Sequence, residues 1–333
     1  MVDVANIFLV VVSFGLAAWL PIEVFLFAYA FLGPLHYLTE ISWLKERRFF
    51  TTTSSDSWVL AALCLLACVC SMGTVPLVHH YFGADGMLQR LTPFGAHAAF
   101  AALIWSVLSV YVPRWKWRAF LLVVVSDVLL VIQPGVRFQL AFGLLLPTMI
   151  HVIVFTGIFV LLGALRSRSR AGMVTFVAFV ICAIAPFVFP MPISPYESDS
   201  AALSRLHESG FASLNLHLQS LFGDVSKTLA SPLAVRLQVL IAFGYTYHYL
   251  NWFSKTKVIG WHKADWRQLI GVVVLWLVSV GIYWLDYALG VLVLLFLSYL
   301  HVFLELPLNV RSIVSVSTEL RRIFVPSTAQ AAR

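Results

Sequence analysis

Apolar runs of about 20 residues recur along the chain, separated by short polar segments. A bilayer core takes roughly 20 apolar residues per helix, so runs of this length predict membrane-spanning helices. A soluble domain has about 25% charged residues, whereas this chain is 11% charged and 61% hydrophobic. The runs do not alternate polar and apolar residues, as the strands of a β-barrel would. We therefore expect an all-α fold, a polytopic integral-membrane helical bundle.

The runs predict ten transmembrane helices in a single transmembrane domain, residues 1–333. One long kinked helix is an alternative to the first two spans, which a turn at Leu20-Pro21 separates. Pro307 is expected to end the last span, leaving residues 306–333 as a cytoplasmic tail. The predicted spans are Ala5–Leu20, Ile22–Leu44, Ser57–Val78, Thr92–Val112, Ala119–Gln133, Phe138–Leu165, Met173–Ile193, Pro232–Trp252, Gln268–Leu285 and Tyr287–Glu305.

The basic residues predict the orientation of these spans. If the Lys45–Arg48 loop faces the cytoplasm, alternation places 17 of the 22 Lys and Arg residues on the same side. Cytoplasmic loops are enriched in Lys and Arg, so both termini should be cytoplasmic. The basic loops thus set the orientation of the spans, and we expect no nucleic-acid partner despite the net charge of +7.

The connection 194–231 is the longest segment predicted on the outer side. Leucine and phenylalanine recur there every three to five residues between Leu203 and Leu221, with polar residues between them. This spacing predicts an amphipathic helix in the membrane interface, broken at Gly210. A helix packed as a lid on the bundle is an equal alternative.

Histidines on three predicted spans lie at similar depth near the cytoplasmic side: His36, His248 and His301. Two of them begin a His-x-x-x-Glu pair, with Glu40 and Glu305. Residues four apart share a helix face, so each pair can direct both groups to one point. Ionisable residues within spans are costly and indicate function. These five residues are the predicted metal ligands, although the sequence leaves open whether the three spans touch.

Mixed nitrogen and oxygen ligands favour iron, with manganese or zinc as alternatives. Glu40, Glu305 and Asp127 are the predicted catalytic or proton-transfer carboxylates, and Asp127 is also expected to orient a ligating histidine. Additional candidates are His151 in mid-span, Asn251 after His248, and His262 in a cytoplasmic loop. Each histidine taken alone fits a packing role better than a ligand role, and only the three together favour a shared site.

The leading functional prediction is a metalloenzyme that oxidises, desaturates or cleaves a lipid-soluble substrate near the cytoplasmic leaflet. Its expected partners are membrane lipids, a hydrophobic small-molecule substrate and a redox partner, and its expected location is the bacterial inner membrane. The alternative is a transporter or proton-coupled carrier that uses the same intramembrane residues. A non-catalytic assembly or lipid-binding protein is a third possibility.

Overall fold

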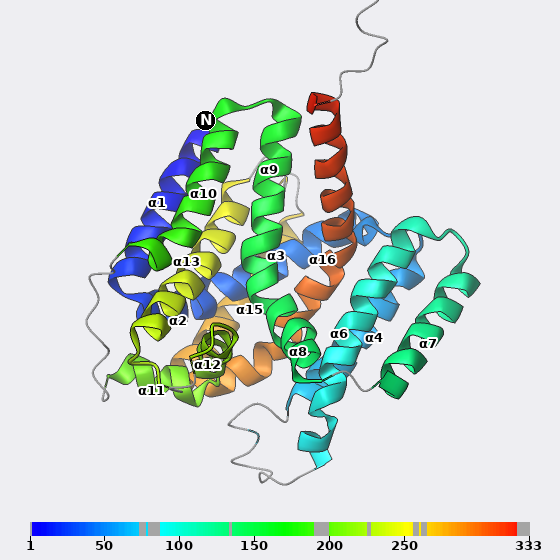
Figure 1. Ribbon diagram of the computed structural model, residues 1–333, viewed down its shortest axis with the longest axis horizontal. Coiled ribbons are helices and arrows are strands. Elements are labelled where there is room, and N and C mark those ends of the chain that lie inside the picture. Colours follow the sequence, from blue (N-terminus) through cyan, green and yellow to red (C-terminus); the bar gives the residue numbers. More distant parts are fainter. Residues whose placement is uncertain are drawn as a thin grey trace, which may run out of the picture.

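The computed structural model describes residues 2–72, 78, 87–132, 135–189, 200–224, 228–255, 260 and 265–324. All elements in these ranges are helices, which pack side by side as one bundle (Figure 1). The α-helices are α1 (Val2–Trp19), α2 (Pro21–Phe27), α3 (Gly33–Glu46), α4 (Ser54–Ser71), α6 (Met87–Tyr111), α7 (Trp115–Ile132), α8 (Val136–Phe138), α9 (Thr156–Ser167), α10 (Arg170–Val188), α11 (Ala201–Glu208), α12 (Ala212–Leu221), α13 (Pro232–Ser254), α15 (Trp266–Leu285) and α16 (Tyr287–Phe324). The other elements are the π-helices η1 (Ala28–Leu32) and η4 (Gln139–Phe155) and the short 3₁₀-helix η2 (Arg48–Phe50).

Within these ranges, eight helical stretches are long and apolar enough to cross a membrane. Two of the eight join several elements: Pro21–Glu46 runs through α2, η1 and α3, and Val136–Ser167 runs through α8, η4 and α9. Of the predicted spans, the fifth and the eighth correspond to α7 and α13, which are not among the eight. The helical membrane fold is therefore confirmed in its class, whereas the count of ten and the orientation stay predictions.

Two details of the helices differ from or refine the sequence expectations. α1 and α2 are separate helices, because the backbone leaves the helical region at Leu20. The prediction that Pro307 ends the last span is wrong, because α16 continues through this proline to Phe324. Proline removes one backbone donor from a helix, and within a bundle neighbouring groups can satisfy the freed carbonyl, so a helix can pass through.

In its described residues, the connection 194–231 contains two short helices, α11 and α12. Gly210 lies between them with a φ of 83°, a left-handed conformation that glycine adopts without strain. The predicted break at this residue is confirmed. Leu206, Leu214 and Leu218 are buried, so both helices pack on the bundle; α12 contacts α13, and α11 contacts α2 and α16.

Four of the bundle's elements meet where the site lies. α16 packs against α3 and η4, and α13 packs against the same two elements. Each of the four carries one buried histidine. The second, eighth and tenth predicted spans are thus in contact, joined by the sixth.

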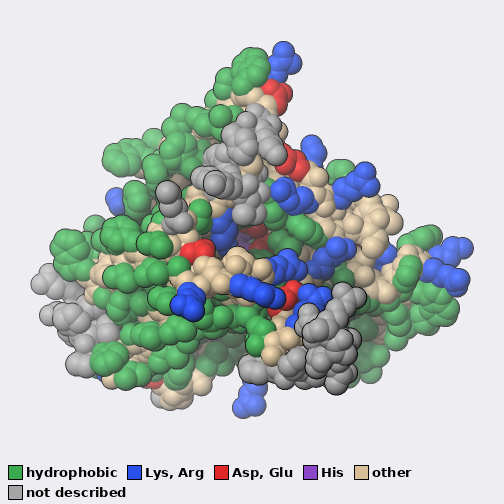
Figure 2. Space-filling model, turned by 90° about the horizontal axis from the view of Figure 1, so that it is seen from above, with side chains coloured by type: hydrophobic (Ala, Val, Ile, Leu, Met, Phe, Trp, Pro, Cys, Tyr) green, Lys and Arg blue, Asp and Glu red, His purple; other side chains and the backbone are tan. Residues whose placement is uncertain are grey.

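One end of the bundle exposes a group of basic residues. Figure 2 shows the end at which α9 joins α10, where Lys and Arg side chains gather between larger hydrophobic areas. The turn between these helices carries exposed Arg166, Arg168 and Arg170. Their concentration agrees with the bias that the positive-inside rule describes.

Candidate metal centre

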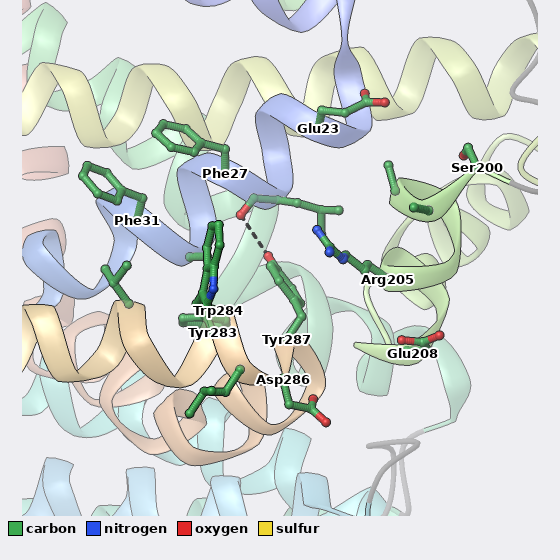
Figure 3. Close-up of a pocket in the computed structure, with 16 residues that line it drawn as sticks. Glu23, Phe27, Phe31, Ser200, Arg205, Glu208, Tyr283, Trp284, Asp286 and Tyr287 are labelled. Atoms are coloured by element: carbon green, nitrogen blue, oxygen red, sulfur yellow. Dashed lines mark hydrogen bonds between the residues drawn. The ribbon is translucent and has the colours of Figure 1, made fainter.

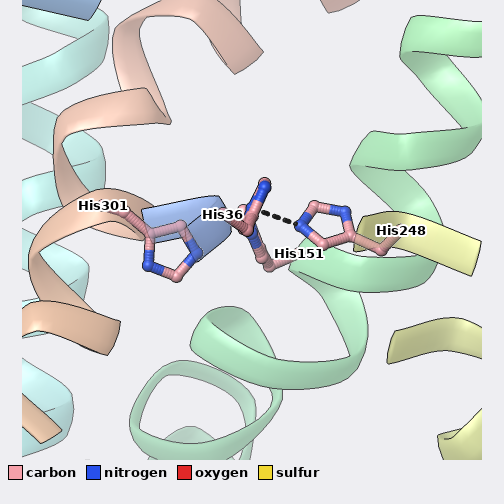
Figure 4. A group of neighbouring side chains, drawn as sticks. All are labelled: His36, His151, His248 and His301. Carbon is pink, nitrogen blue, oxygen red and sulfur yellow. Dashed lines mark hydrogen bonds between the residues drawn. The ribbon is translucent and has the colours of Figure 1, made fainter. Parts of the chain in front are cut away.

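His36, His151, His248 and His301 come together in the interior of the bundle (Figure 4). None of the four is more than 7% exposed. One ring nitrogen from each can be chosen so that all four nitrogens lie within 4.8 Å of one another. Uncharged polar groups are rarely buried at this density without a shared ligand or a complete hydrogen-bond network. The cluster is therefore a candidate metal centre.

The four imidazoles form a closed ring of edge-to-face contacts. The ring centroids are 4.6 Å apart for His36 and His248, 4.7 Å for His248 and His151, 5.1 Å for His151 and His301, and 5.3 Å for His301 and His36. The interplanar angles are 66–82°. Rings tilted in this way bring their nitrogen-bearing edges toward a common interior rather than stacking face to face.

One nitrogen separation in the cluster matches that of two ligands on one metal. His36 Nε2 and His248 Nε2 are 3.0 Å apart. Imidazole ligands about 2.0–2.1 Å from a metal have nitrogens roughly 2.9–3.4 Å apart at angles between 90° and tetrahedral. The four nitrogens lie within 4.8 Å of one another, whereas two ligands on opposite sides of a metal are roughly 4 Å apart. Metal binding therefore requires the most distant nitrogens to approach each other by about 1 Å.

Several polar atoms of the cluster have no hydrogen-bond partner. They are His36 Nδ1, His151 Nε2 and His301 Nδ1, which also make no ion-pair contact. Leaving a buried polar group unpaired costs about 1–3 kcal/mol. A bound metal ion would coordinate some of these nitrogens directly.

Two buried glutamates border the histidines without joining the four-nitrogen group. Glu40 Oε2 lies 3.0 Å from His36 Nε2, and Glu305 Oε2 lies 3.2 Å from His151 Nδ1. Both side chains are about 3% exposed. A carboxylate on the ring nitrogen that does not bind metal orients a ligating imidazole and raises its basicity. Glu305 can do this for His151 through Nδ1 when Nε2 is the ligand, whereas Glu40 contacts the nitrogen of His36 that also faces His248. The contacts therefore place Glu40 and Glu305 beside the ligands, a position from which either also reaches the interior of the ring.

Local helix geometry explains how His151 enters the cluster. Residues Gln139–Phe155 form a π-helix, in which hydrogen bonds run from i to i+5. Pro147 lies within it and supplies no backbone N–H. The wider turn brings residues about five apart onto one face, and His151 and Thr156 both contact His248 of α13. π-Helical segments are rare and often occur at functional sites.

Other predicted site residues lie apart from the four histidines. Asn251 is buried on α13, three residues beyond His248. The structure does not bring Asp127 to the cluster, because α7 packs against α6 at the edge of the bundle and leaves this aspartate exposed (Figure 1). His262 lies outside the described residues.

Two contacts that sequence analysis missed hold the histidines in place. Thr156 Oγ1 lies 2.7 Å from His248 Nδ1, and the ring of Tyr37 stacks on His301 with centroids 4.2 Å apart. The Tyr37 hydroxyl is also 2.9 Å from that of Tyr249. A threonine or tyrosine in an apolar helix is commonplace, so the sequence carried no signal for these roles.

Thr156→Val is expected to lower metal affinity about 10–100-fold, the usual effect of losing an outer partner of a ligand. In the tautomer whose Nδ1–H donates to the Thr156 hydroxyl, His248 Nε2 is free to bind metal. Thr156→Ser keeps this bond and should keep the affinity. Thr148→Val is the matched control, since the Thr148 hydroxyl donates only to Leu144 of its own helix. Metal titration of the three variants measures these affinities. Equal losses of affinity in Thr156→Val and Thr148→Val would contradict the role of Thr156.

Four neutral imidazoles around one point can bind a divalent transition metal, and the identity of that metal is open. Imidazole suits zinc, copper, iron and nickel, whereas no thiolate is present among the four ligands. Comparison of the chain with protein-family models, curated proteins and solved structures finds no match, so only the chemistry of the site bears on function.

Proposed function

We propose that this chain is an integral-membrane metalloenzyme in which a four-histidine iron centre oxidises, desaturates or cleaves a lipid-soluble substrate. The observation that carries the proposal is the set of four buried imidazoles with ligand nitrogens within 4.8 Å of one another. Such a centre inside an apolar bundle meets substrates that partition into the bilayer. We also propose the bacterial inner membrane as its location, with a redox partner on the cytoplasmic side.

The charges around the cluster support a divalent cation. Four neutral imidazoles leave the full charge of the metal uncompensated, and an isolated ion is costly in a low-dielectric interior. Glu40 and Glu305 supply two negative charges beside the ligands. Lys255, just beyond the end of α13, interacts electrostatically with both carboxylates and with that of Asp3. Three carboxylates then balance one lysine and one dication.

Lys255 keeps its positive charge at neutral pH. Burial lowers the pKa of Lys255 to about 8, although the carboxylates of Glu305, Asp3 and Glu40 act in the opposite direction. Most of its population is therefore protonated at pH 7. A dication bound by the histidines would favour the ionised forms of Glu40 and Glu305, since its charge would offset theirs.

The number of ligands favours iron over zinc for catalysis. Zinc with four protein ligands is tetrahedral and closed, which is typical of structural sites, whereas catalytic sites keep a position open. A six-coordinate metal with four histidines keeps two positions open for substrate or oxygen. When bound, iron supplies the one-electron chemistry that oxidation of an unactivated hydrocarbon requires. Glu305 would orient His151 through its Nδ1, and Glu40, on the nitrogen of His36 that faces His248, can hold a proton beside the four ligand nitrogens.

The proposal is tested by elemental analysis of detergent-purified protein and by product analysis. After loading with iron, manganese or zinc, we expect about one metal per chain, and we expect only the redox-active metals to support chemistry. Loaded protein is incubated with membrane lipids, oxygen and a reductant, and mass spectrometry reports oxidised, desaturated or cleaved products. Metal-free protein that transforms lipids equally well would overturn the proposal. Transport of a solute into vesicles without chemical change would favour a carrier instead.

A further inference from the structure

A cavity of about 1060 Å³ lies between α2 and η1, α11, and the turn from α15 to α16 (Figure 3). One of its ends is charged, with Glu23, Arg205, Glu208 and Asp286. α2 and α15 run from this end toward Phe31 and Val280, where the lining is apolar. Next to this deep end, the indole N–H of Trp276 donates to the Phe31 carbonyl oxygen over 2.8 Å. The cavity, here called the amphiphile slot, therefore has a polar mouth and an apolar interior.

The apolar wall of the amphiphile slot is open to the surroundings of the bundle. Phe27 is 61% exposed, Trp284 89% and Leu285 85%. α15 as a whole buries only a small share of its length in the structure. Exposed apolar surface of this extent on a membrane-spanning helix contacts lipid. A molecule from the bilayer can enter the slot sideways without crossing water.

The charges at the mouth specify a head group of mixed sign. Figure 3 shows the Arg205 guanidinium pointing into the slot toward Tyr287, and no carboxylate in the described part of the chain lies within ion-pair distance of it. A guanidinium fork matches phosphate oxygens. Glu23, Glu208 and Asp286 are exposed at the same mouth, where three negative charges beside one arginine complement a head group that also carries a cationic group. A phosphate joined to an amine satisfies both requirements.

The direction of the slot relates it to the four histidines. Glu23 at the mouth precedes His36 by 13 residues, which is about 20 Å of helix, and Phe31 at the deep end precedes it by about 7–8 Å. One leaflet of the bilayer core is about 15 Å thick, so a lipid chain that starts at the mouth reaches the deep end. Beyond this end, Tyr283, Tyr29 and Tyr37 follow at ring-centroid distances of 6.4 Å and 6.5 Å, and Tyr37 stacks on His301.

We propose that the amphiphile slot binds a zwitterionic aminophospholipid, with its phosphate on Arg205, its amine among the three carboxylates and an acyl chain pointing toward the histidines. As a binding site, the slot is independent of the metal. Its assignment as the site of the substrate's head group rests on the proposed function. The substrate class is then an acyl lipid oxidised far from its head.

Binding is measured by native mass spectrometry and by lipid titration, with phosphatidylethanolamine and phosphatidylglycerol of identical chains added to delipidated protein. We expect the ethanolamine lipid to bind more tightly, and Arg205→Gln to weaken it about tenfold, the effect of one charge-assisted hydrogen bond. Glu208→Gln should reduce the preference for the ethanolamine lipid. Arg137→Gln is the matched control, because Arg137 is an exposed arginine on α8, away from the slot.

Three outcomes would overturn the binding site: equal affinity for the two lipids, equal effects of Arg205→Gln and Arg137→Gln, or displacement of the lipid by inorganic phosphate alone at matched concentration. Metal content is determined on the same samples. Because Arg205 is far from the histidines along the chain and in contact with none of them, its replacement should leave the metal in place. Lipid selectivity in a protein that binds no metal would therefore refute the proposed function while leaving the slot as a binding site.

Discussion

Alanine at any one of His36, His151, His248 and His301 is expected to abolish stable metal binding. Each contributes one nitrogen to a set within 4.8 Å, and no further histidine or carboxylate belongs to the set in the described part of the chain. The loss should exceed the roughly 10–100-fold that follows from removing an outer partner of a ligand. Elemental analysis after gel filtration should give about one metal per chain for the wild type and little for the four variants.

His97→Ala is the matched control for this experiment. His97 lies on α6, and its Nδ1 is 2.9 Å from the carbonyl oxygen of Pro93 in the same helix. It is a partly buried histidine outside the cluster, so its replacement should leave the metal content unchanged. Retention of metal in all four variants, or loss of metal in His97→Ala as well, would contradict the four-histidine centre.

The His-x-x-x-Glu spacing predicted that each pair can direct both of its groups to one point, and both pairs reach the cluster. Within α3, His36 and Glu40 lie on one face and their side chains are 3.0 Å apart. On α16, His301 and Glu305 both point to the cluster, but the Glu305 carboxylate lies beside His151 of η4. Spacing along one helix fixes which residues share a face. It cannot tell which neighbouring helix that face meets.

His151 shows why the site was only partly predictable. The sequence places it in mid-span behind a proline, where a histidine serves packing as readily as binding. Its role depends on the π-helical turn of η4 and on contacts of η4 with both α13 and α16. Those contacts are long-range, and no local periodicity encodes them. The prediction for Asp127 was wrong for a different reason. The depth of a residue along a span does not show whether that span reaches the centre of the bundle.

The apolar runs, by contrast, were sufficient for the class of fold. Hydropathy depends on local composition and on the thickness of the bilayer, so it can be read without knowledge of packing. The prediction from the basic loops, however, is wrong for one residue. Arg118 is one of the 17 basic residues that are expected to face the cytoplasm and set the orientation of the spans, but its side chain is fully buried.

Arg118→Met is expected to lower the free energy of unfolding by about 3–5 kcal/mol, the cost of leaving a buried charge unpaired. The Arg118 guanidinium donates to both carboxylate oxygens of Asp56, over 2.6 Å and 2.8 Å, and to Thr52 Oγ1 over 2.6 Å. It also donates to the carbonyl oxygens of Val112 and Pro113, so the first turn of α7 is tied to α4 and to the end of α6. Denaturant titration in detergent micelles, followed by circular dichroism, measures the loss.

Arg114→Met controls for the general effect of removing a basic residue from this loop. Arg114 is exposed, and replacing such a residue usually changes stability by less than about 0.5 kcal/mol. The double variant Arg118→Met/Asp56→Asn removes both charges and keeps a side-chain oxygen that can accept from Thr53 at the start of α4. It should be more stable than Arg118→Met alone, since no buried carboxylate then lacks its counter-charge. Stability losses that simply add in the double variant would show that the two side chains act independently. The metal content should be the same in all these proteins, because the ion pair joins α4 to α7, and neither helix carries one of the four histidines.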